Sequence, residues 1–313
     1  MSELYKENKI TRGFVTVATG NDFYYKCART LLRSYRLTNS KYPFAIICDR
    51  ENEYTKEFDD VVILDNPQNN YLDKLRVLID SPYDETFFIE TDCIVYNNIE
   101  CFFDLLAKEY DFSAFGWNDG DLSTWFKDTQ LVVERFGEKA SSIHIFNPGY
   151  LFIRKTKVTA KIYNDAIDIG RWITENNIKG GKISLFCKGT LRDDQLFAMS
   201  MKINDCYCCE EPTQGKCVFL PNTKRIIRIS LLNHKLDAFY CDRILEDCNI
   251  LHFSSRRCRE EGLYLQQSIV VNMLTKSVPR WLVRLVEARV VYYFFHIFRK
   301  IKYKLIHIFK REK

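Results

Sequence analysis

The feature that most constrains the fold is a run of apolar residues that stops abruptly at two acids. Phe87, Phe88 and Ile89 are followed directly by Glu90, Thr91 and Asp92. A short, continuous apolar run is typical of a strand that is buried on both faces, as in a parallel sheet. Because side chains alternate along a strand, we expect Glu90 and Asp92 on one face at the strand's exit.

Strands and helices alternate along the first part of the chain. Apolar runs at residues 13–18, 44–48 and 61–64 predict three more strands, and apolar residues at helical spacing from Phe23 predict a helix after the first. This alternation predicts an α/β fold with a mostly parallel central sheet flanked by helices.

The sequence pattern in the middle of the chain predicts further helices and strands. They are a short helix at 99–106, strands at 112–115, 143–146 and 150–153, a tight turn at 147–149, and helices at 157–176 and 193–201.

Two loops fall at carboxyl ends of predicted strands, where ligands gather in parallel sheets. One is the loop at residues 19–22 and the other is the acidic pair. The first loop lacks the glycines of a dinucleotide fold and the Gly-Lys-Ser/Thr of a P-loop. Neither a nicotinamide dinucleotide nor a hydrolysed nucleoside triphosphate is therefore favoured.

The acidic pair has two interpretations. Burying two like charges is costly, so the pair indicates a bound cation, nearby basic side chains or exposure to solvent. Carboxylate oxygens suit a hard divalent cation, which commonly bridges to a diphosphate. An acidic exit from strand to loop without a metal is the alternative.

The net charge of +5 comes from the C-terminal part of the chain. Residues 280–313 hold ten Lys and Arg side chains and two Glu, whereas the rest of the chain has 36 basic and 39 acidic residues. This argues against a nucleic-acid partner.

Residues 1–13 are polar and mixed in charge, without the apolar core of a secretory signal, so we expect a cytoplasmic protein. Most of the twelve cysteines should then be reduced. For the crowded group Cys206, Cys208, Cys209 and Cys217, a structural zinc site and ordinary free thiols both remain open.

The chain resembles the GT-A nucleotide-sugar transferases over about residues 13–255, and most closely glycosyltransferase family 8, the glycogenin-like and galactosyltransferase-like group. The strongest similarity is Lys74, then Ser81-Pro82-Tyr83-Asp84, then Glu90-Thr91-Asp92. These are similar to the family's helix Lys, its SPYD turn and its DxD strand, with Glu in place of the first Asp.

The resemblance implies a set of site residues. Glu90, Asp92 and His252 would hold Mn²⁺ or Mg²⁺, and Asp194 and Gln195 would face the reacting carbon of the sugar. The nucleotide sugar would be bound by Thr19, Asn21, Tyr24, Lys74, Asn147 and Gly149, with Tyr24 stacked on uracil. The family's motif after the His ends in a Lys that this chain lacks, and Arg256, Arg257 and Arg259 are the candidates to replace it.

Some of these residues have plainer alternatives. Tyr24 could simply cover its helix, the acids at 193 and 194 could cap a helix, and a His beside apolar residues is often part of a core.

The implied activity is metal-dependent transfer of a hexose from a nucleotide diphosphate sugar, a UDP-hexose, to a glycan or lipid-linked acceptor, with retention. A GT-A fold that has lost catalysis and serves as a membrane-tethered glycan-binding or scaffold protein is the alternative. A nucleotidyltransferase is disfavoured because no glycine-rich basic triphosphate loop lies near the N-terminus.

The chain therefore divides into a catalytic domain, 1–275, and a basic, aromatic tail, 276–313. The apolar stretch at 290–298 is too short to span a bilayer of about 30 Å. Its aromatic residues and cationic flanks suit an amphipathic helix on an anionic membrane surface, which would place the protein peripherally on the inner face of a membrane. A helix docked on the protein's own core or on a partner is the alternative.

Overall fold

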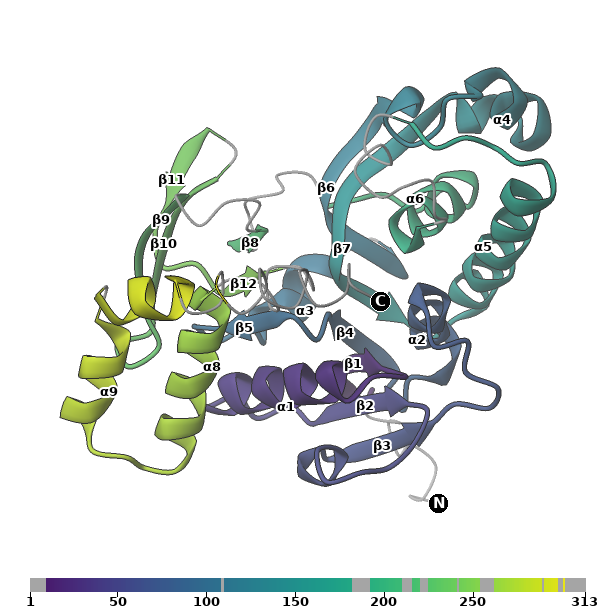
Figure 1. Ribbon diagram of the computed structural model, residues 1–313. Helices are drawn as coiled ribbons and strands as arrows, with labels where there is room; N and C mark the ends of the chain where they lie inside the picture. Colours follow the sequence, from purple (N-terminus) through teal and green to yellow (C-terminus); the bar gives the residue numbers. More distant parts are fainter. Residues whose placement is uncertain are drawn as a thin grey trace, which may run out of the picture.

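A six-stranded sheet forms the centre of the molecule (Figure 1). The computed structural model describes residues 10–107, 110–181, 192–209, 216–219, 225–240, 242–253, 262–288, 290–297 and 301. The strands, in the order in which they lie in the sheet, are β3 (Asp60–Ile63), β2 (Phe44–Cys48), β1 (Arg12–Ala18), β4 (Glu85–Ile89), β7 (Ser142–Arg154) and β6 (Phe112–Asp121). The first four run parallel, and β7 is antiparallel to both β4 and β6. The predicted α/β fold with a mostly parallel central sheet is confirmed.

Helices cover both faces of this sheet. One face packs on α1 (Asp22–Arg36) and α3 (Cys101–Leu106), and the other packs on α2 (Val77–Asp80), α5 (Lys157–Glu175) and α6 (Asp193–Ile203). The short α4 (Thr129–Phe136) also contributes to the second face. Because side chains alternate along a strand, Phe14 and Phe87 belong to the first core, whereas Val15 and Phe88 belong to the second. The continuous apolar runs in the sequence reflect this burial on both faces.

The predicted tight turn at residues 147–149 is wrong, because β7 continues through these residues as one strand. Tyr150 pairs with Ile89 of β4, so the neighbouring strand holds β7 extended there. Against β6 the register jumps, since Phe146 pairs with Gly116 and Leu151 pairs with Ala114. The additional residues of β7 form a bulge, a feature that often re-aims side chains beside a functional site.

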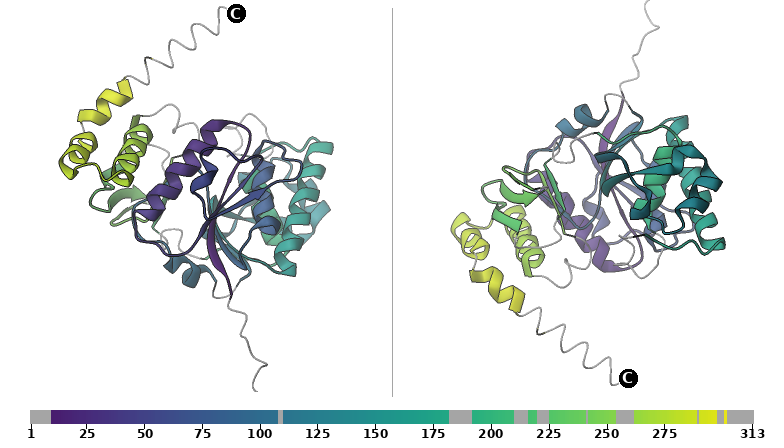
Figure 2. Two further views of the ribbon diagram at one scale, coloured as in Figure 1. Left: turned by 90° about the horizontal axis from the view of Figure 1, so that it is seen from below. Right: turned by 90° about the horizontal axis from the view of Figure 1, so that it is seen from above.

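Two small sheets complete the fold. One contains β5 (Cys93–Val95), β12 (Ile250–His252) and β8 (Cys217–Phe219), and the other contains β9 (Ile226–Ser230), β10 (Lys235–Tyr240) and β11 (Arg243–Leu245). Together with α8 (Gly262–Thr275) and α9 (Arg280–Glu287) they bury a third apolar cluster. Figure 2 shows α8 and α9 at one end of the molecule, with α4 and α5 at the other.

Apolar burial and hydrogen bonds attach the helix α9 to this third cluster. Val283 is fully buried, and the Glu287 carboxylate accepts hydrogen bonds from the backbone N–H groups of Leu231 (2.7 Å) and Leu232 (3.2 Å). Residues 290–297, which follow α9, are also helical. Within the described part of the chain, no helix combines the length and apolar character needed to cross a bilayer.

Candidate active site

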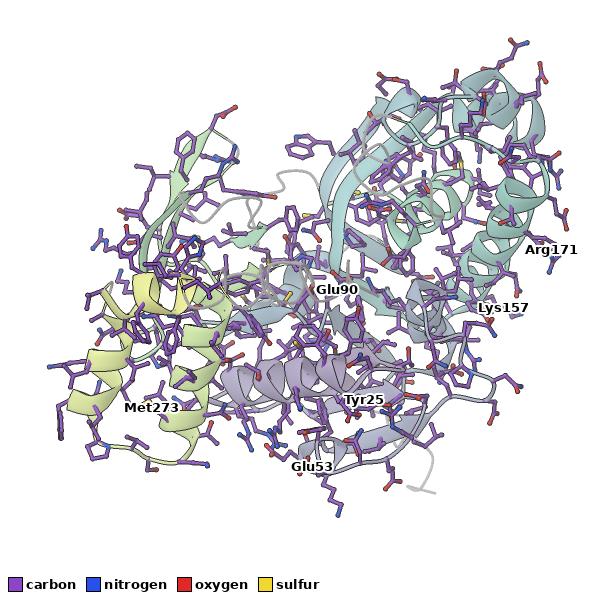
Figure 3. The ribbon with its side chains drawn as sticks, in the orientation of Figure 1. Tyr25, Glu53, Glu90, Lys157, Arg171 and Met273 are labelled. Carbon is purple, nitrogen blue, oxygen red and sulfur yellow. The ribbon has the colours of Figure 1, made fainter. Side chains whose placement is uncertain are left out.

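The two acids lie on a turn that leaves the central sheet. Strand β4 ends at Ile89, and the turn is closed by a hydrogen bond from the Cys93 N–H to the Glu90 carbonyl (3.1 Å). Glu90 and Asp92 therefore converge through a turn, and not through the alternation of a strand as we expected. Figure 3 labels Glu90 near the middle of the molecule.

The short sheet beside this turn brings His252 to the acids. Strand β12 runs antiparallel to β5 and pairs His252 with Cys93, while the Phe253 N–H donates to the Asp92 carbonyl (3.0 Å). The His252 Nε2 consequently lies 2.8 Å from a Glu90 oxygen and 3.1 Å from a Asp92 oxygen. The structure thus brings together the three predicted metal ligands, although 159 residues lie between Asp92 and His252 in the sequence.

The other nitrogen of His252 is held by the bulge in β7. The Asn147 Oδ1 accepts a hydrogen bond from the Gly149 N–H (2.8 Å) and lies 3.1 Å from His252 Nδ1. Because that oxygen is an acceptor, it fixes the hydrogen on Nδ1 and leaves Nε2 to face the two acids. A second partner of this kind is what orients a histidine that binds a metal.

The charges of this cluster are strongly coupled. Burial opposes the charged imidazole, but the carboxylates of Asp92 and Glu90 outweigh burial and raise the pKa of His252 to about 10. Burial likewise opposes the charge on Glu90, yet Lys74 and His252 hold its pKa well below the usual range. A divalent ion at this position would take the place of the Nε2 proton, because metals bind neutral imidazole.

Asp92 and His252 offer donor atoms that fit a divalent ion, whereas Glu90 is outside the group of mutually close ligand atoms and is in contact with Lys74. Single ligand atoms of Asp92, Cys93 and His252 lie within 4.8 Å of one another. Carboxylate oxygen and imidazole nitrogen together suit Mn²⁺. Burial raises the pKa of the Cys93 thiol well above its usual value, so Cys93 is a core residue and a poor ligand.

Lys74 links the turn to the start of α6. It lies on a 3₁₀ helix (Tyr71–Arg76), and its Nζ contacts a Glu90 oxygen and, at 2.7 Å, an Asp193 oxygen. Burial alone would lower the pKa of Lys74, but Asp193 and Glu90 raise it well above the ordinary value. Lys74 is therefore a permanent positive charge beside the candidate metal ligands.

Asp194 is held by its neighbour in sequence. The Arg192 Nε donates to Asp194 Oδ1 at 2.8 Å, and Arg192 Nη2 contacts the other oxygen. Burial raises the pKa of Asp194 to about 6 despite the opposing effect of Arg192. A buried carboxyl group with a shifted pKa in a cavity is a candidate for chemistry.

Gln195 has a structural role in its described contacts. Its Nε2 donates to the Trp125 carbonyl (2.7 Å), and its Oε1 accepts from the Arg192 N–H (3.3 Å), which caps the first turn of α6. Asp194 lines the cavity described next, and Gln195 does not.

Two cavities of about 430 and 290 Å³ meet at the cluster. Both are lined by Lys74, Glu90 and Asp92. The larger also contacts Asp193, Asp194, Asn147, Arg192, His252 and several aromatic side chains. The smaller is lined by Val17, Thr19, Tyr24, Asn69, Asn70, Phe88 and Thr91. The charged cluster thus forms the boundary between an acidic, aromatic cavity and a smaller one that contains Tyr24.

Only some of the residues predicted to bind the nucleotide sugar in and after the loop that follows β1 line the smaller cavity. Thr19 and Tyr24 line the smaller cavity, and the Thr19 hydroxyl donates to Asp73 (2.7 Å). The Asn21 side chain does not line that cavity and instead caps α1 by accepting from the Phe23 N–H (2.8 Å).

Two further predictions concern a group of arginines and a group of cysteines. Arg256, Arg257 and Arg259 are outside the described residues. Cys206, Cys208 and Cys217 are buried, and no potential metal-binding group formed by the described residues includes these three or Cys209.

Arg192 and Asp193 are site residues that sequence reasoning missed. Asp193 was visible only as one of two adjacent acids at a helix start, and its contact with Lys74 joins segments far apart in the chain. Arg192 sits one residue before the helix, and nothing in its local sequence indicates its ion pair with Asp194.

The solved structures to which the chain is similar include glycosyltransferases, all at low sequence identity. The chain is similar to galactosyltransferase LgtC, solved in complex with donor and acceptor sugar analogs, with 12% sequence identity over 85% of this chain and 95% of LgtC and a TM-score of 0.49. It is also similar to the glycosyltransferase GlyE of Streptococcus pneumoniae TIGR4 (16% identity over 65% of this chain and 46% of GlyE, TM-score 0.42). For the bifunctional protein WbbM the identity is 10% over 71% of this chain and 41% of WbbM, with a TM-score of 0.44.

The chain spans less than half of the length of GlyE and WbbM. No protein-family model and no curated protein matches the sequence. Identities this low carry no information on substrate or mechanism.

Gly149 provides a direct test of how His252 is placed. A Cβ atom at this position would lie 2.5 Å from His252 Nδ1 and 2.8 Å from Asn147 Oδ1, closer than side chains tolerate. We expect Gly149→Ala to displace the imidazole and to weaken Mn²⁺ binding by about 10–100-fold, as loss of an orienting partner does at metal sites. Calorimetric titration with Mn²⁺ measures this, and an unfolding midpoint close to that of the unsubstituted chain shows that the fold is intact. Unchanged Mn²⁺ affinity would mean that His252 does not need this position.

Proposed function

We propose that the chain is a metal-dependent glycosyltransferase with a GT-A fold, of family 8 by the resemblance of its motifs. It transfers a hexose from a UDP-hexose to a glycan or lipid-linked acceptor with retention. The observation that carries the proposal is the convergence of Glu90, Asp92 and His252 at the boundary between two cavities. An ion there would be held by carboxylate oxygens and an imidazole nitrogen, the donors that suit Mn²⁺.

Different residues of the chain would bind the ion, the diphosphate and the base. Asp92 and His252 would hold the ion, with Glu90 shared between the ion and Lys74. When bound, the ion supplies Lewis-acid stabilisation of the negative charge that develops on the departing diphosphate. Lys74 adds a fixed positive charge on the same side, and Tyr24 in the smaller cavity offers a ring for the base.

The sugar would occupy the start of the larger cavity. Asp194 lines that cavity, and we assign its carboxylate to the reacting carbon of the hexose. It would act either as a nucleophile or by stabilising positive charge on the sugar ring. Arg192 orients it through the paired contacts. The predicted phosphate contacts from Arg256, Arg257 and Arg259 belong to the same proposal.

Calorimetric titration of UDP with and without Mn²⁺ tests this function. We expect UDP to bind at least tenfold more tightly with Mn²⁺, because an ion held by Asp92 and His252 would offset the negative charge of the diphosphate. Mn²⁺-dependent hydrolysis of a UDP-hexose should accompany binding. A protein that serves as a scaffold with a lost active site would show neither effect, and that result would overturn the proposal.

We also propose that the tail 276–313 binds an anionic membrane surface on the cytoplasmic side. Trp281 and Leu285 on α9 are 62% and 57% exposed, and Phe294 is 68% exposed. Such apolar side chains next to Arg280 and Arg284 fit a helix that lies in the interface between headgroups and acyl chains.

The membrane proposal predicts the behaviour of a shortened chain. Removal of residues 290–313 keeps Val283 and Glu287, which attach α9 to the core. The shortened chain loses Phe294 and seven of the ten basic residues of 280–313, so we expect it to sediment less with vesicles that contain phosphatidylserine than the full chain does. Equal sedimentation of the two forms would reject the proposal, and vesicles without anionic lipid provide the control.

A further inference from the structure

The loop between β1 and α1 forms part of the wall of the smaller cavity. Thr19 in this loop and Tyr24 in the first turn of α1 both line that cavity, where the proposed function places the base. Gly20 has a φ of +74°, in the left-handed region that favours glycine. Because glycine has more conformational freedom than any other residue, contacts from other segments must hold the loop in this shape.

Asp73 holds the loop through Thr19. Asp73 lies on the 3₁₀ helix at residues 71–76 and is only 3% exposed. Its Oδ2 accepts a hydrogen bond from the Thr19 hydroxyl (2.7 Å), and its Oδ1 accepts one from the Gln68 N–H (2.8 Å). Residues 69–70, which follow Gln68, also line the smaller cavity. One buried carboxylate therefore joins two walls of this cavity.

Asp49 and Arg50, which directly follow β2, hold Gly20 through both of its backbone polar groups. The Gly20 N–H donates to Asp49 Oδ1 (3.1 Å), and the Gly20 carbonyl accepts from Arg50 Nη1 (2.9 Å). Arg50 Nη1 also donates to Asp49 Oδ2 (2.8 Å), and the hydroxyl of Tyr25, labelled in Figure 3, donates to Asp49. Burial opposes the charge on Asp49, but the hydrogen bonds from Tyr25 and Gly20 keep its pKa below the ordinary value. The carboxylate therefore stays ionised at neutral pH as an acceptor for the loop.

The two acids act on the cavity only through this loop. Asp49 and Asp73 line neither the larger nor the smaller cavity, so a ligand bound there does not meet them directly. They come from two different segments of the chain, and each accepts from one of two adjacent loop residues. Two adjacent residues that are tied to two segments leave the loop little freedom to move.

We infer that Asp49 and Asp73 are positioning residues for the nucleotide, which fix Thr19 and Gly20 in the wall of the smaller cavity before the ligand binds. A site that is already ordered binds its ligand without the entropic cost of ordering the loop. This inference rests on the proposed function and deepens it, because it names the residues that prepare the nucleotide site. If the two acids only stabilised the fold, their loss would lower the unfolding midpoint and leave the affinity for UDP unchanged.

A double-mutant cycle tests the contact between Thr19 and Asp73. The proteins are the unsubstituted full chain, Thr19→Val, Asp73→Ala and the double variant, each titrated calorimetrically with UDP in the presence of Mn²⁺. We expect each single substitution to weaken UDP binding about tenfold, a common effect of losing a hydrogen bond to a charged group. The double variant should bind UDP no more weakly than Asp73→Ala, because both substitutions remove the same contact. Thr19→Ser, which keeps the hydroxyl, should restore most of the affinity.

Asp59 provides a matched control for Asp49. Its carboxylate also accepts from a backbone N–H, that of Phe44 (2.8 Å), and from an arginine, Arg36 (3.0 Å), but at the opposite end of β2. We expect Asp49→Ala to weaken UDP binding about tenfold and Asp59→Ala to leave it unchanged. In hydrolysis of a UDP-hexose, Asp49→Ala should raise KM and change kcat by less than about threefold, since the loop affects binding of the nucleotide and not the reacting carbon.

Two results would overturn the inference while UDP still binds to the unsubstituted chain. One is equal weakening by Thr19→Val with and without the Asp73 carboxylate, which would mean that the hydroxyl contacts the nucleotide directly. The other is equal UDP affinity of Asp49→Ala and Asp59→Ala, and this comparison decides even where Asp73→Ala does not fold. Absence of Mn²⁺-dependent UDP binding in the unsubstituted chain would overturn the proposed function and this inference with it, so the two failures are distinguishable.

Discussion

Replacement of Asp92 with Asn is expected to lower the rate of sugar transfer, or of UDP-hexose hydrolysis, by about 10²–10³-fold. Asp92 is 5% exposed and lies 3.1 Å from His252 Nε2, so its charge is directed at the candidate ion. Asn has nearly the same shape but one fewer negative charge, and it binds a divalent ion weakly. The measurement is the initial rate of hexose release from UDP-hexose as a function of Mn²⁺ concentration.

The fold should survive this substitution. The backbone of Asp92 is held through its carbonyl, which accepts from the Phe253 N–H, and an amide side chain can still accept from His252. Asp168→Asn on the exposed surface of α5 is a matched control that removes the same charge far from the cavities. Full activity of Asp92→Asn, with the control also active, would refute the assignment of Asp92 to the ion.

The same substitution should change the proton affinity of His252. Asp92 is one of the two carboxylates that raise the pKa of this imidazole to about 10. With Asn at position 92 that pKa should fall, and NMR of the ring protons in the absence of metal would show titration at lower pH. This result depends only on geometry and charge, so it tests the site independently of catalysis.

The strands that could be predicted from the sequence are those that consist of continuous apolar residues. Residues 87–89 read as a buried strand because both faces of the sheet are covered, and β1 and β2 follow the same rule. The short strands β5, β8 and β12 have three residues each, too few for any periodicity, although β5 and β12 are what carry His252 to Asp92. Their pairing is a property of the whole fold.

Residues 147–149 were misread for a related reason. Asn, Pro and Gly in succession favour a turn locally, but pairing of β7 with β4 and β6 keeps the chain extended, and the surplus residues become a bulge. Gly149 is needed there because His252 packs against it, and not because the backbone turns. The resemblance had pointed to these residues as near the sugar; Asn147 and Pro148 line the larger cavity, and Gly149 does not.

The acids at the start of α6 show the limit of spacing arguments. Adjacent Asp193 and Asp194 look equivalent in sequence, and both could act as helix-terminal charges. The structure separates them, because Asp193 pairs with Lys74 and Asp194 pairs with Arg192. Only tertiary contacts with partners from different segments distinguish their environments.

Replacement of Asp194 with Asn is expected to lower kcat by about 10²–10⁴-fold, the range in which removal of a directly acting carboxylate falls. Asp194 is 2% exposed and lines the cavity beside the proposed hexose position. Affinity for UDP with Mn²⁺ should change by less than about threefold, since Asp194 does not contact the predicted ligands of the ion. The measurement is kcat for UDP-hexose hydrolysis together with calorimetric UDP affinity.

The pH dependence of the rate distinguishes a direct catalytic role of Asp194 from a structural one. Because burial raises the pKa of Asp194 to about 6, its reactive carboxylate form dominates above pH 6 and is lost as the pH falls through that value. The rate of the unsubstituted enzyme should therefore decline below about pH 6, and the residual rate of Asp194→Asn should lack this decline. Asp193→Asn is the matched control, since it removes the neighbouring charge and the contact with Lys74 and should keep an acidic limb, moved to lower pH because the charge of Asp193 helps to raise the pKa of Asp194. An acidic limb that persists in Asp194→Asn, or equal losses of kcat in the two variants, would assign the effect to the charge of the helix terminus and not to a carboxylate at the reacting carbon.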